Sequence, residues 1–258
     1  MSKHDTGSPT DVRTTTRRDM LRAAGLGSAA LILAGCTKGG IDLFAPQQPS
    51  RAVVGPSGIV LDFSTDTDVL NYAYALEQLE AAYYTAALGS AGFAALSANE
   101  QEVLGDLQKH EVIHREFFKT VLGSAAIPTI NFNTTTVGTL TASRAVLLST
   151  SQLLEDTGVS AYNGAGKYLT SAANLLVAGK IVSVEARHAA AIRDIRDTTG
   201  RLFAGDDVVN SAGLDVKSEP STVGAAVNSL NVIVGSIAIG TQPDASKKTA
   251  DFNAPTPV

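Results

Sequence analysis

The sequence predicts an all-α protein whose main domain is a four-helix bundle with a long crossover between helices 2 and 3. Apolar residues follow a 3.5-residue rhythm from about residue 66 to 200, which is typical of packed helices. A Glu-x-x-His pair occurs twice, in corresponding places of two successive helical hairpins. With 258 residues, 44% of them hydrophobic, the chain is long enough for this one domain and for extensions at both ends.

The N-terminal segment, residues 1–35, is predicted to be a Tat-type signal peptide. Arg17 and Arg18 precede an apolar run that ends at Gly35. This run is shorter than the roughly 20 residues that cross a bilayer, and it matches the apolar core of a signal peptide. The twin arginines resemble the signal of the Tat pathway, which exports folded proteins. We therefore expect an exported protein of the periplasm or cell envelope that meets the Tat translocase on its way.

The single cysteine of the chain, Cys36, closes the sequence Leu33-Ala34-Gly35-Cys36, which resembles a bacterial lipobox. Lipid chains on Cys36 would anchor the protein to a membrane without spanning it. The alternative is an ordinary buried thiol. Residues 36–65 then form a lipid-anchored linker of low helical propensity. One cysteine also excludes internal disulfides and a cysteine-ligated iron–sulfur centre.

The first and third predicted helices share one design, in which a glutamate is followed seven residues later by a tyrosine. Glu77 and Tyr84 form this pair in helix one, which begins near Asp66, and Glu155 and Tyr162 form it in helix three. Residues seven apart lie two turns apart on the same face of a helix. Both pairs are therefore expected to face the core.

The second and fourth predicted helices carry the two Glu-x-x-His pairs, Glu111 with His114 and Glu185 with His188. Residues three apart share a helix face, so each pair directs an oxygen and a nitrogen at one point. The sequence Ser97-Ala98-Asn99-Glu100 is a capping box that predicts the start of helix two.

The connection between the two hairpins, residues 123–138, is rich in Thr, Asn and Gly. Fully stretched it would cover about 50 Å, whereas a helix of about 25 residues is about 38 Å long. Helix three can therefore start parallel to helix two.

Residues 201–258 are predicted to be a C-terminal extension on the bundle. Residues 223–239 form a short fifth helix or an extended segment there, and the tail from Gln242 is disordered.

The carboxylates and imidazoles of the four helices lie on seams that are otherwise apolar and contain no Lys or Arg. Burying an ionised carboxylate alone costs several kcal/mol, and four together would also repel one another. Two divalent metal ions would neutralise them, and iron and manganese both suit mixed carboxylate and imidazole ligands. The alternative, carboxylates that are protonated or face solvent, stays open. The predicted metal ligands are Glu77, Glu111, His114, Glu155, Glu185 and His188.

The stretch Val69–Tyr84 resembles bacterial ferritin-like domain proteins, of the group related to plant desiccation-related proteins, and the similarity extends over Asp66–Thr199. In the wider superfamily the glutamates of Glu-x-x-His bridge two metals. The resemblance implies bridging roles for Glu111 and Glu185, terminal roles for Glu77 and Glu155, and one nitrogen ligand per metal from His114 and His188.

Four further side chains near the predicted ligands have open roles. The superfamily often places a tyrosine beside the ligands, which implies such a role for Tyr84 and Tyr162; core aromatics with a hydroxyl bonded across the bundle are an equal alternative. Glu80, one turn from Glu77, is either an extra ligand or, as we expect, a solvated side chain. His110 lies off the seam and is expected to be exposed or beside a ligand.

The net charge of −5 and the lack of a basic stripe argue against nucleic-acid binding.

We expect metal oxidation or peroxide detoxification at the cell envelope, with oxygen or peroxide as a small-molecule oxidant, in the manner of a ferroxidase or a manganese catalase. The alternative is a non-catalytic, metal-stabilised envelope lipoprotein for stress or desiccation protection or for partner binding. Whether the protein is an enzyme stays open. A monomer or small oligomer is expected, because a lipid anchor fits poorly with a closed storage cage.

Overall fold

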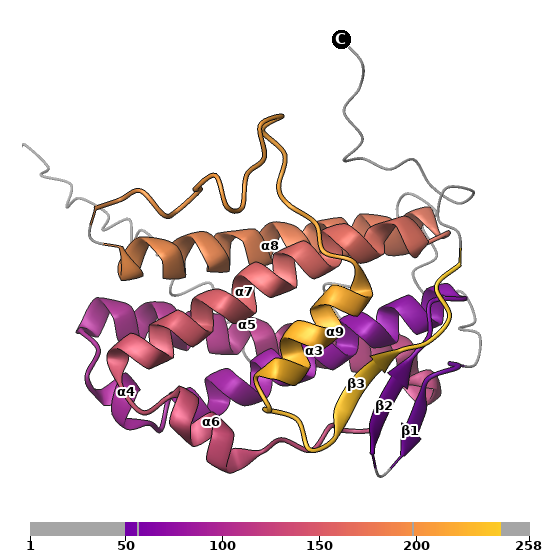
Figure 1. Ribbon diagram of the computed structural model, residues 1–258, viewed down its shortest axis with the longest axis horizontal. Helices are drawn as coiled ribbons and strands as arrows, with labels where there is room; N and C mark the ends of the chain where they lie inside the picture. Colours follow the sequence, from indigo (N-terminus) through magenta and orange to yellow (C-terminus); the bar gives the residue numbers. More distant parts are fainter. Residues whose placement is uncertain (1–49, 56, 198, 244–258) are drawn as a thin grey trace, which may run out of the picture. The chain divides into compact units, whose positions relative to one another are not determined.

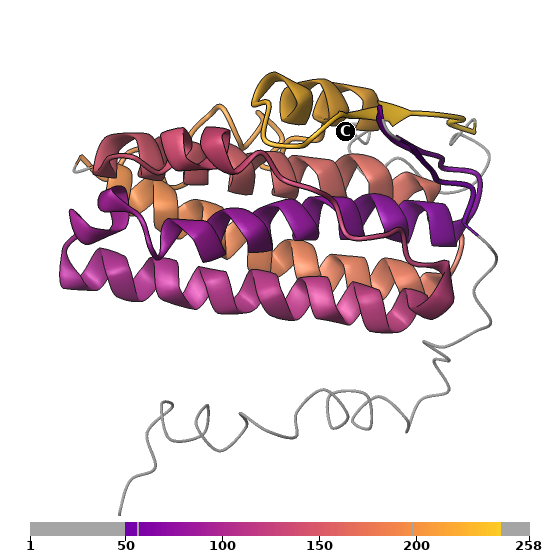
Figure 2. The same cartoon turned by 90° about the horizontal axis from the view of Figure 1, so that it is seen from below.

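The computed structural model describes residues 50–55, 57–197 and 199–243, and four long helices lie side by side in it (Figures 1 and 2). Helix α3 packs against α5, and α7 packs against α8, so the bundle consists of two hairpins. This confirms the predicted all-α bundle. Arg17, Arg18, Cys36 and the tail from residue 244 lie outside the described residues. The long helices are α3 (Asp66–Ala87), α5 (Ala98–Leu122), α7 (Arg144–Ala165) and α8 (Ala172–Arg196).

Side-chain caps fix the start of every long helix. Thr65 caps α3, and Ser97 caps α5 in a capping box with Glu100, as the sequence predicts. Ser143 and Ser171 cap α7 and α8. Each cap satisfies backbone N–H groups that the first turn of a helix leaves without a partner. The helix boundaries are therefore largely set by local sequence.

The connection from α5 to α7 runs along the length of the bundle (Figure 2). It begins with a 3-10 turn, η2 (Gly123–Ala125), and contains a short helix, α6 (Thr134–Leu140), which the sequence analysis did not predict. Arg144 at the start of α7 donates to Glu100 at the start of α5 (Nε–Oε1 3.1 Å). At the opposite end, Asp66 of α3 accepts a hydrogen bond from Asn174 of α8 (2.8 Å). Helices α5 and α7 therefore start at one end, and α3 and α8 at the other.

A three-stranded sheet lies beside the bundle, in the order β1-β2-β3, and the sequence analysis did not predict it (Figure 1). Strands β1 and β2 are antiparallel, whereas β2 and β3 are parallel, with Gly58 opposite Ser236. Gly58 has φ 134°, and any side chain there would collide with the Ser236 backbone. The last part of the predicted linker thus pairs with the C-terminal extension. The strands are β1 (Val53–Gly55), β2 (Gly58–Leu61) and β3 (Ser236–Ile239).

The C-terminal extension contributes a helix, α9 (Pro220–Ser229), in addition to β3. Val223 and Val227 are buried, and α9 contacts both α7 and β3. The sequence predicts either a short helix or an extended segment between residues 223 and 239; the structure contains a helix followed by a strand.

Helix α3 is the most enclosed helix of the bundle, and almost all of its residues are buried. It contacts α5, α7, α6 and β2, so neighbours surround it on several sides. In contrast, α5 and α8 bury only one face. Among the described helices, none is both long and apolar enough to pass through a lipid bilayer.

Candidate metal centre

All six predicted ligand side chains converge inside the bundle. The four glutamates are 0% exposed, and the two histidines are the only ones of the six with measurable exposure, His114 at 9% and His188 at 3%. One glutamate comes from each of the four long helices, because the repeated hairpins aim the same position at the same level of the core. The six residues are Glu77 from α3, Glu111 and His114 from α5, Glu155 from α7, and Glu185 and His188 from α8.

The ligand atoms form two overlapping groups, in each of which all atoms lie within 4.8 Å of one another. Glu111 and Glu185 belong to both groups. A carboxylate has two oxygens, so these two residues are placed to touch both groups at once. The first group adds Glu77 and His114, and the second adds Glu155 and His188.

The Nδ1 atom of His114 faces carboxylates from three helices. It lies 3.0 Å from Oε1 of Glu185, 3.3 Å from Oε2 of Glu77 and 3.5 Å from Oε2 of Glu111. Three acidic groups around one nitrogen are more than a single imidazole proton can satisfy. The arrangement therefore surrounds a point that attracts a cation.

The Nδ1 atom of His188 has matching surroundings, 2.7 Å from Oε1 of Glu111 and 3.4 Å from Oε2 of Glu155. Its other ring nitrogen, Nε2, lies 2.9 Å from Nδ1 of His110. A partner on Nε2 fixes the ring orientation and favours a tautomer with Nδ1 free to bind a metal. From its sequence position, His110 was expected to be either exposed or beside a ligand. In the structure it is both exposed and next to the predicted ligand His188.

The inward-facing atoms of the cluster are buried, and their only contacts with polar groups are the ion pairs between the two imidazoles and the carboxylates, which leave most of the oxygens without a donor. Burial of an unsatisfied polar group costs about 1–3 kcal/mol, and more for a charged one. A cation would satisfy all of these atoms together, so the residues present fit a metal site. The atoms are Oε2 of Glu77 and Glu155, both carboxylate oxygens of Glu111 and Glu185, and Nδ1 of His114 and His188.

Two tyrosines donate hydrogen bonds to Glu77 and Glu155, the two glutamates that each belong to a single group of ligand atoms. The hydroxyl of Tyr84 donates to Oε1 of Glu155 (2.6 Å), and the hydroxyl of Tyr162 donates to Oε1 of Glu77. Each bond crosses from one hairpin to the other. The tyrosine occupies one oxygen of its glutamate, and the second oxygen is the unpartnered one that faces the cluster. Each tyrosine therefore lies beside a predicted ligand and is also a core aromatic whose hydroxyl bonds across the bundle, so the two roles expected from the sequence are met by one contact.

Burial and mutual repulsion change the protonation of the cluster. Burial raises the pKa of Glu77 to about 7 and raises that of Glu185 well above its usual range. Burial opposes the charge on Glu111 as well, but His114 and His188 reverse the balance and lower its pKa to about 2. Against the effect of burial, neighbouring carboxylates raise the pKa of His188 to about 10. Protons would therefore compete with any metal ion that binds this cluster.

A family model for the ferritin-like domain matches residues 65–198, from the cap of α3 to the end of α8. The chain belongs to this family. No curated protein matches the chain. The ferritin-like domain therefore accounts for the four long helices, while the sheet and α9 lie outside the matched residues.

One expectation about this ferritin-like domain was wrong. Glu80 was expected to be solvated, but it is only 3% exposed and lies at the cluster. The expectation assumed that α3 buries a single stripe, whereas α3 is enclosed on nearly all sides. A signal was available, since α3 has no Lys or Arg along its whole length.

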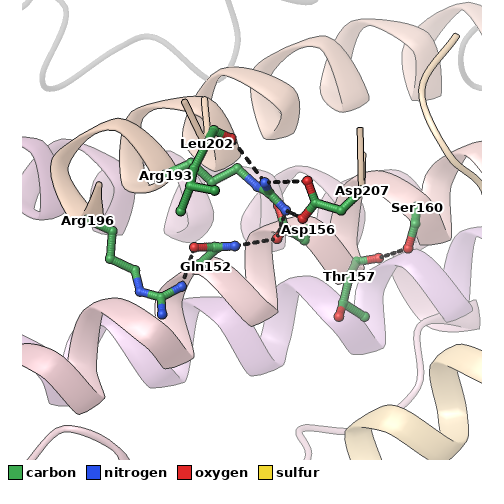
Figure 3. A network of polar contacts seen from close by, with 8 residues as sticks. All are labelled: Gln152, Asp156, Thr157, Ser160, Arg193, Arg196, Leu202 and Asp207. Atoms are coloured by element: carbon green, nitrogen blue, oxygen red, sulfur yellow. Dashed lines mark hydrogen bonds and ion pairs between the residues drawn. The ribbon is translucent and has the colours of Figure 1, made fainter. Parts of the chain in front are cut away.

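Arg193 is the centre of a buried ion-pair network that the sequence did not predict (Figure 3). Arg193 is 2% exposed. It donates to both carboxylate oxygens of Asp156 (2.7 Å each), to Asp207 (2.7 Å) and to the carbonyl of Leu202 (3.0 Å). Arg193 of α8 thus holds the segment after α8 and is itself paired with Asp156 of α7.

Proposed function

We propose that this ferritin-like domain binds two metal ions, iron or manganese, and serves metal oxidation or peroxide detoxification at the cell envelope. The observation that supports the proposal best is the set of eight buried oxygen and nitrogen atoms that converge with only two imidazoles to neutralise four carboxylates. Their division into two overlapping groups supports two ions, with Glu111 and Glu185 shared between them.

The charge of the six ligands supports two divalent ions, because four carboxylates and two such ions give a site that is close to neutral. Mixed carboxylate and imidazole ligands suit both iron and manganese. When bound, such ions supply one-electron redox chemistry with oxygen or peroxide.

The surrounding residues of the chain hold the ligands in place. Burial raises the pKa values of Tyr84 and Tyr162 well above their ordinary range, so both hydroxyls stay protonated and remain donors. They orient Glu155 and Glu77, while His110 orients His188. Partners of this kind commonly tune metal affinity by about 10–100-fold.

For the cellular location we propose Tat export followed by lipid anchoring at Cys36. A protein that folds before export can take up its metal in the cytoplasm, which matches a ligand cluster as buried as this one. Changing Arg17→Lys together with Arg18→Lys should trap the protein in the cytoplasm. Normal export of that variant would instead indicate the Sec route.

A second candidate function is a metal-stabilised but non-catalytic envelope protein for stress or desiccation protection. The near-complete burial of all six ligands favours it, because a substrate needs access that a structural metal does not. Assays of ferrous iron oxidation and of peroxide consumption on the metal-loaded protein separate the two functions. Turnover supports the enzyme, and metal binding without turnover supports the structural role.

The metal content tests both functions together. Elemental analysis of protein purified from its native host should find iron or manganese, with two ions per chain. Glu111→Ala combined with Glu185→Ala removes both shared ligands and should abolish binding, whereas Glu116→Ala should not, since Glu116 is half exposed on the same helix as Glu111. A wild-type protein that contains neither metal and takes up neither on incubation would contradict the proposal.

A further inference from the structure

Glu80 and Gly158 break the two-fold pattern of the cluster. A shift of 78 residues relates Glu77 to Glu155 and Tyr84 to Tyr162, and the same shift relates Glu80 to Gly158. The first hairpin therefore carries a fifth carboxylate at the position where the second hairpin has no side chain at all. The six ligands repeat between the hairpins, but this pair does not.

The two positions are also in contact. A methyl group placed on Gly158 would lie 3.1 Å from Oε1 of Glu80 and 3.4 Å from Oε2 of Glu185. The carboxylates of Glu80 and Glu185 thus lie against the same point of α7. A larger residue at position 158 would occupy the space that the Glu80 carboxylate now fills.

The carboxylate of Glu80 lacks a protein partner that would explain its burial. In the described part of the chain, no hydrogen bond or ion pair to its oxygens is present, and Glu80 lies beside the two groups of ligand atoms within 4.8 Å of one another without belonging to either. The side chain is only 3% exposed, and its carboxylate lies beside that of Glu185 against Gly158. A fifth acidic group among four others is costly unless a cation lies beside it.

We propose that Glu80 is a seventh protein ligand that binds one of the two metal ions from the side of Gly158. The inference rests on the proposed function, because it presumes that the cluster binds metal. Because Gly158, which corresponds to Glu80 in the second hairpin, has no side chain, the two ions differ in their number of ligands, and the ion bound by Glu80 is held more tightly.

Binding of Mn²⁺ to the metal-free full chain tests the inference, with free Mn²⁺ followed by electron paramagnetic resonance. In Glu80→Gln, the affinity for one ion should fall at least about 10-fold, while that for the other changes less than about 2-fold. Glu116→Gln is the matched control and should bind both ions like the wild type. Thermal unfolding of the metal-free variants shows that each is folded, and Glu80→Gln keeps the size of the side chain while removing the carboxylate that would bind the ion.

The outcomes separate this inference from the proposed function. Two ions bound by Glu80→Gln with wild-type affinities, or an equal loss of both, would overturn the role of Glu80 and leave the six-ligand site intact. Failure of the wild type to bind Mn²⁺ would overturn the proposed function itself. A crystal structure of the manganese-loaded wild type provides a direct check: a Glu80 oxygen at bonding distance from one manganese supports the inference, and a carboxylate turned away from both overturns it.

Discussion

The hydroxyl of Tyr84 on α3 donates a hydrogen bond of 2.6 Å to Oε1 of Glu155 on α7. The reciprocal bond runs from Tyr162 on α7 to Glu77 on α3. Each hairpin therefore orients a carboxylate of the other, and the cluster reaches its geometry only when both hairpins are packed together. Under the proposed function, this relationship would couple metal binding to the docking of the two halves.

Tyr84→Phe should weaken metal binding. The change removes a hydrogen bond to a buried carboxylate, which is worth about 1.5–3 kcal/mol, and it frees Glu155 to turn away from the cluster. We expect metal affinity to fall about 10–100-fold, as measured by competition with a chelator. Tyr74→Phe is the control, because this buried tyrosine of the same helix makes no hydrogen bond to a cluster glutamate. Equal affinities of wild type and Tyr84→Phe would contradict the orienting role.

The metal-free protein should lose stability as the pH rises. The pKa of Glu77 is raised from 4.5 to about 7, so the folded state binds its proton more tightly and is penalised as the pH rises through this window. The pKa of His188 is raised from 6.5 to about 10, so its stabilising contribution is complete below 6.5 and is lost towards 10. Glu111, whose pKa is lowered to about 2, adds stability above 4.5 that is lost only under strong acid.

Thermal unfolding of the metal-free protein checks this pH dependence. Between about pH 5 and pH 9 the Tm should fall by on the order of 5 °C. The stabilisation gained on adding Mn²⁺ should grow over the same range, because protons compete with the metal for the ligands. In the Glu111→Ala, Glu185→Ala variant, added Mn²⁺ should no longer raise the Tm. A metal-free protein that becomes more stable towards pH 9 would show that the cluster is not buried in this way.

Gly158→Ala should reveal the contact with Glu80. In an exposed helix interior, Gly to Ala gains about 1 kcal/mol, but here the new methyl group would press on a Glu80 oxygen at 3.1 Å. We expect Gly158→Ala to lower the unfolding free energy in the wild type and to raise it by about 1 kcal/mol in Glu80→Ala. Gly179→Ala is the control, since nothing lies within 4 Å of its added methyl group, and it should be stabilising in both backgrounds. The same effect of Gly158→Ala in both backgrounds would rule out this contact.

Arg193→Lys should loosen the segment after α8. Lysine keeps the charge but loses the paired hydrogen bonds to Asp156 and the hydrogen bond to the Leu202 carbonyl. The unfolding free energy, measured by chemical denaturation, should fall by about 1–3 kcal/mol. Asp207 contributes little to this loss, because its side chain is 61% exposed and screened by solvent. Limited proteolysis should cut residues 201–219 faster in the variant. Arg187→Lys, at an exposed position of α8, should behave like the wild type, and equal cleavage in both variants would contradict the fastening role.

The sequence by itself determined the bundle and its six convergent side chains. Glu111 and His114 share a helix face through their spacing alone, and the repeat of the hairpin places Glu185 and His188 opposite them. The capping box at Ser97 sets the start of α5 in the same local way. These features depend on helical periodicity and on neighbouring residues along the chain, and both can be recognised in the sequence without a structure.

Only the tertiary structure decided the surroundings of those side chains. Glu80 is buried because other elements enclose α3, and its carboxylate has room because Gly158, far away in sequence, has no side chain. The pairing of β2 with β3, and of Arg193 with Asp156 and Asp207, likewise joins distant segments. Burial and electrostatic pairing depend on which surfaces meet in space, and helical periodicity specifies the face of a residue but not what covers that face.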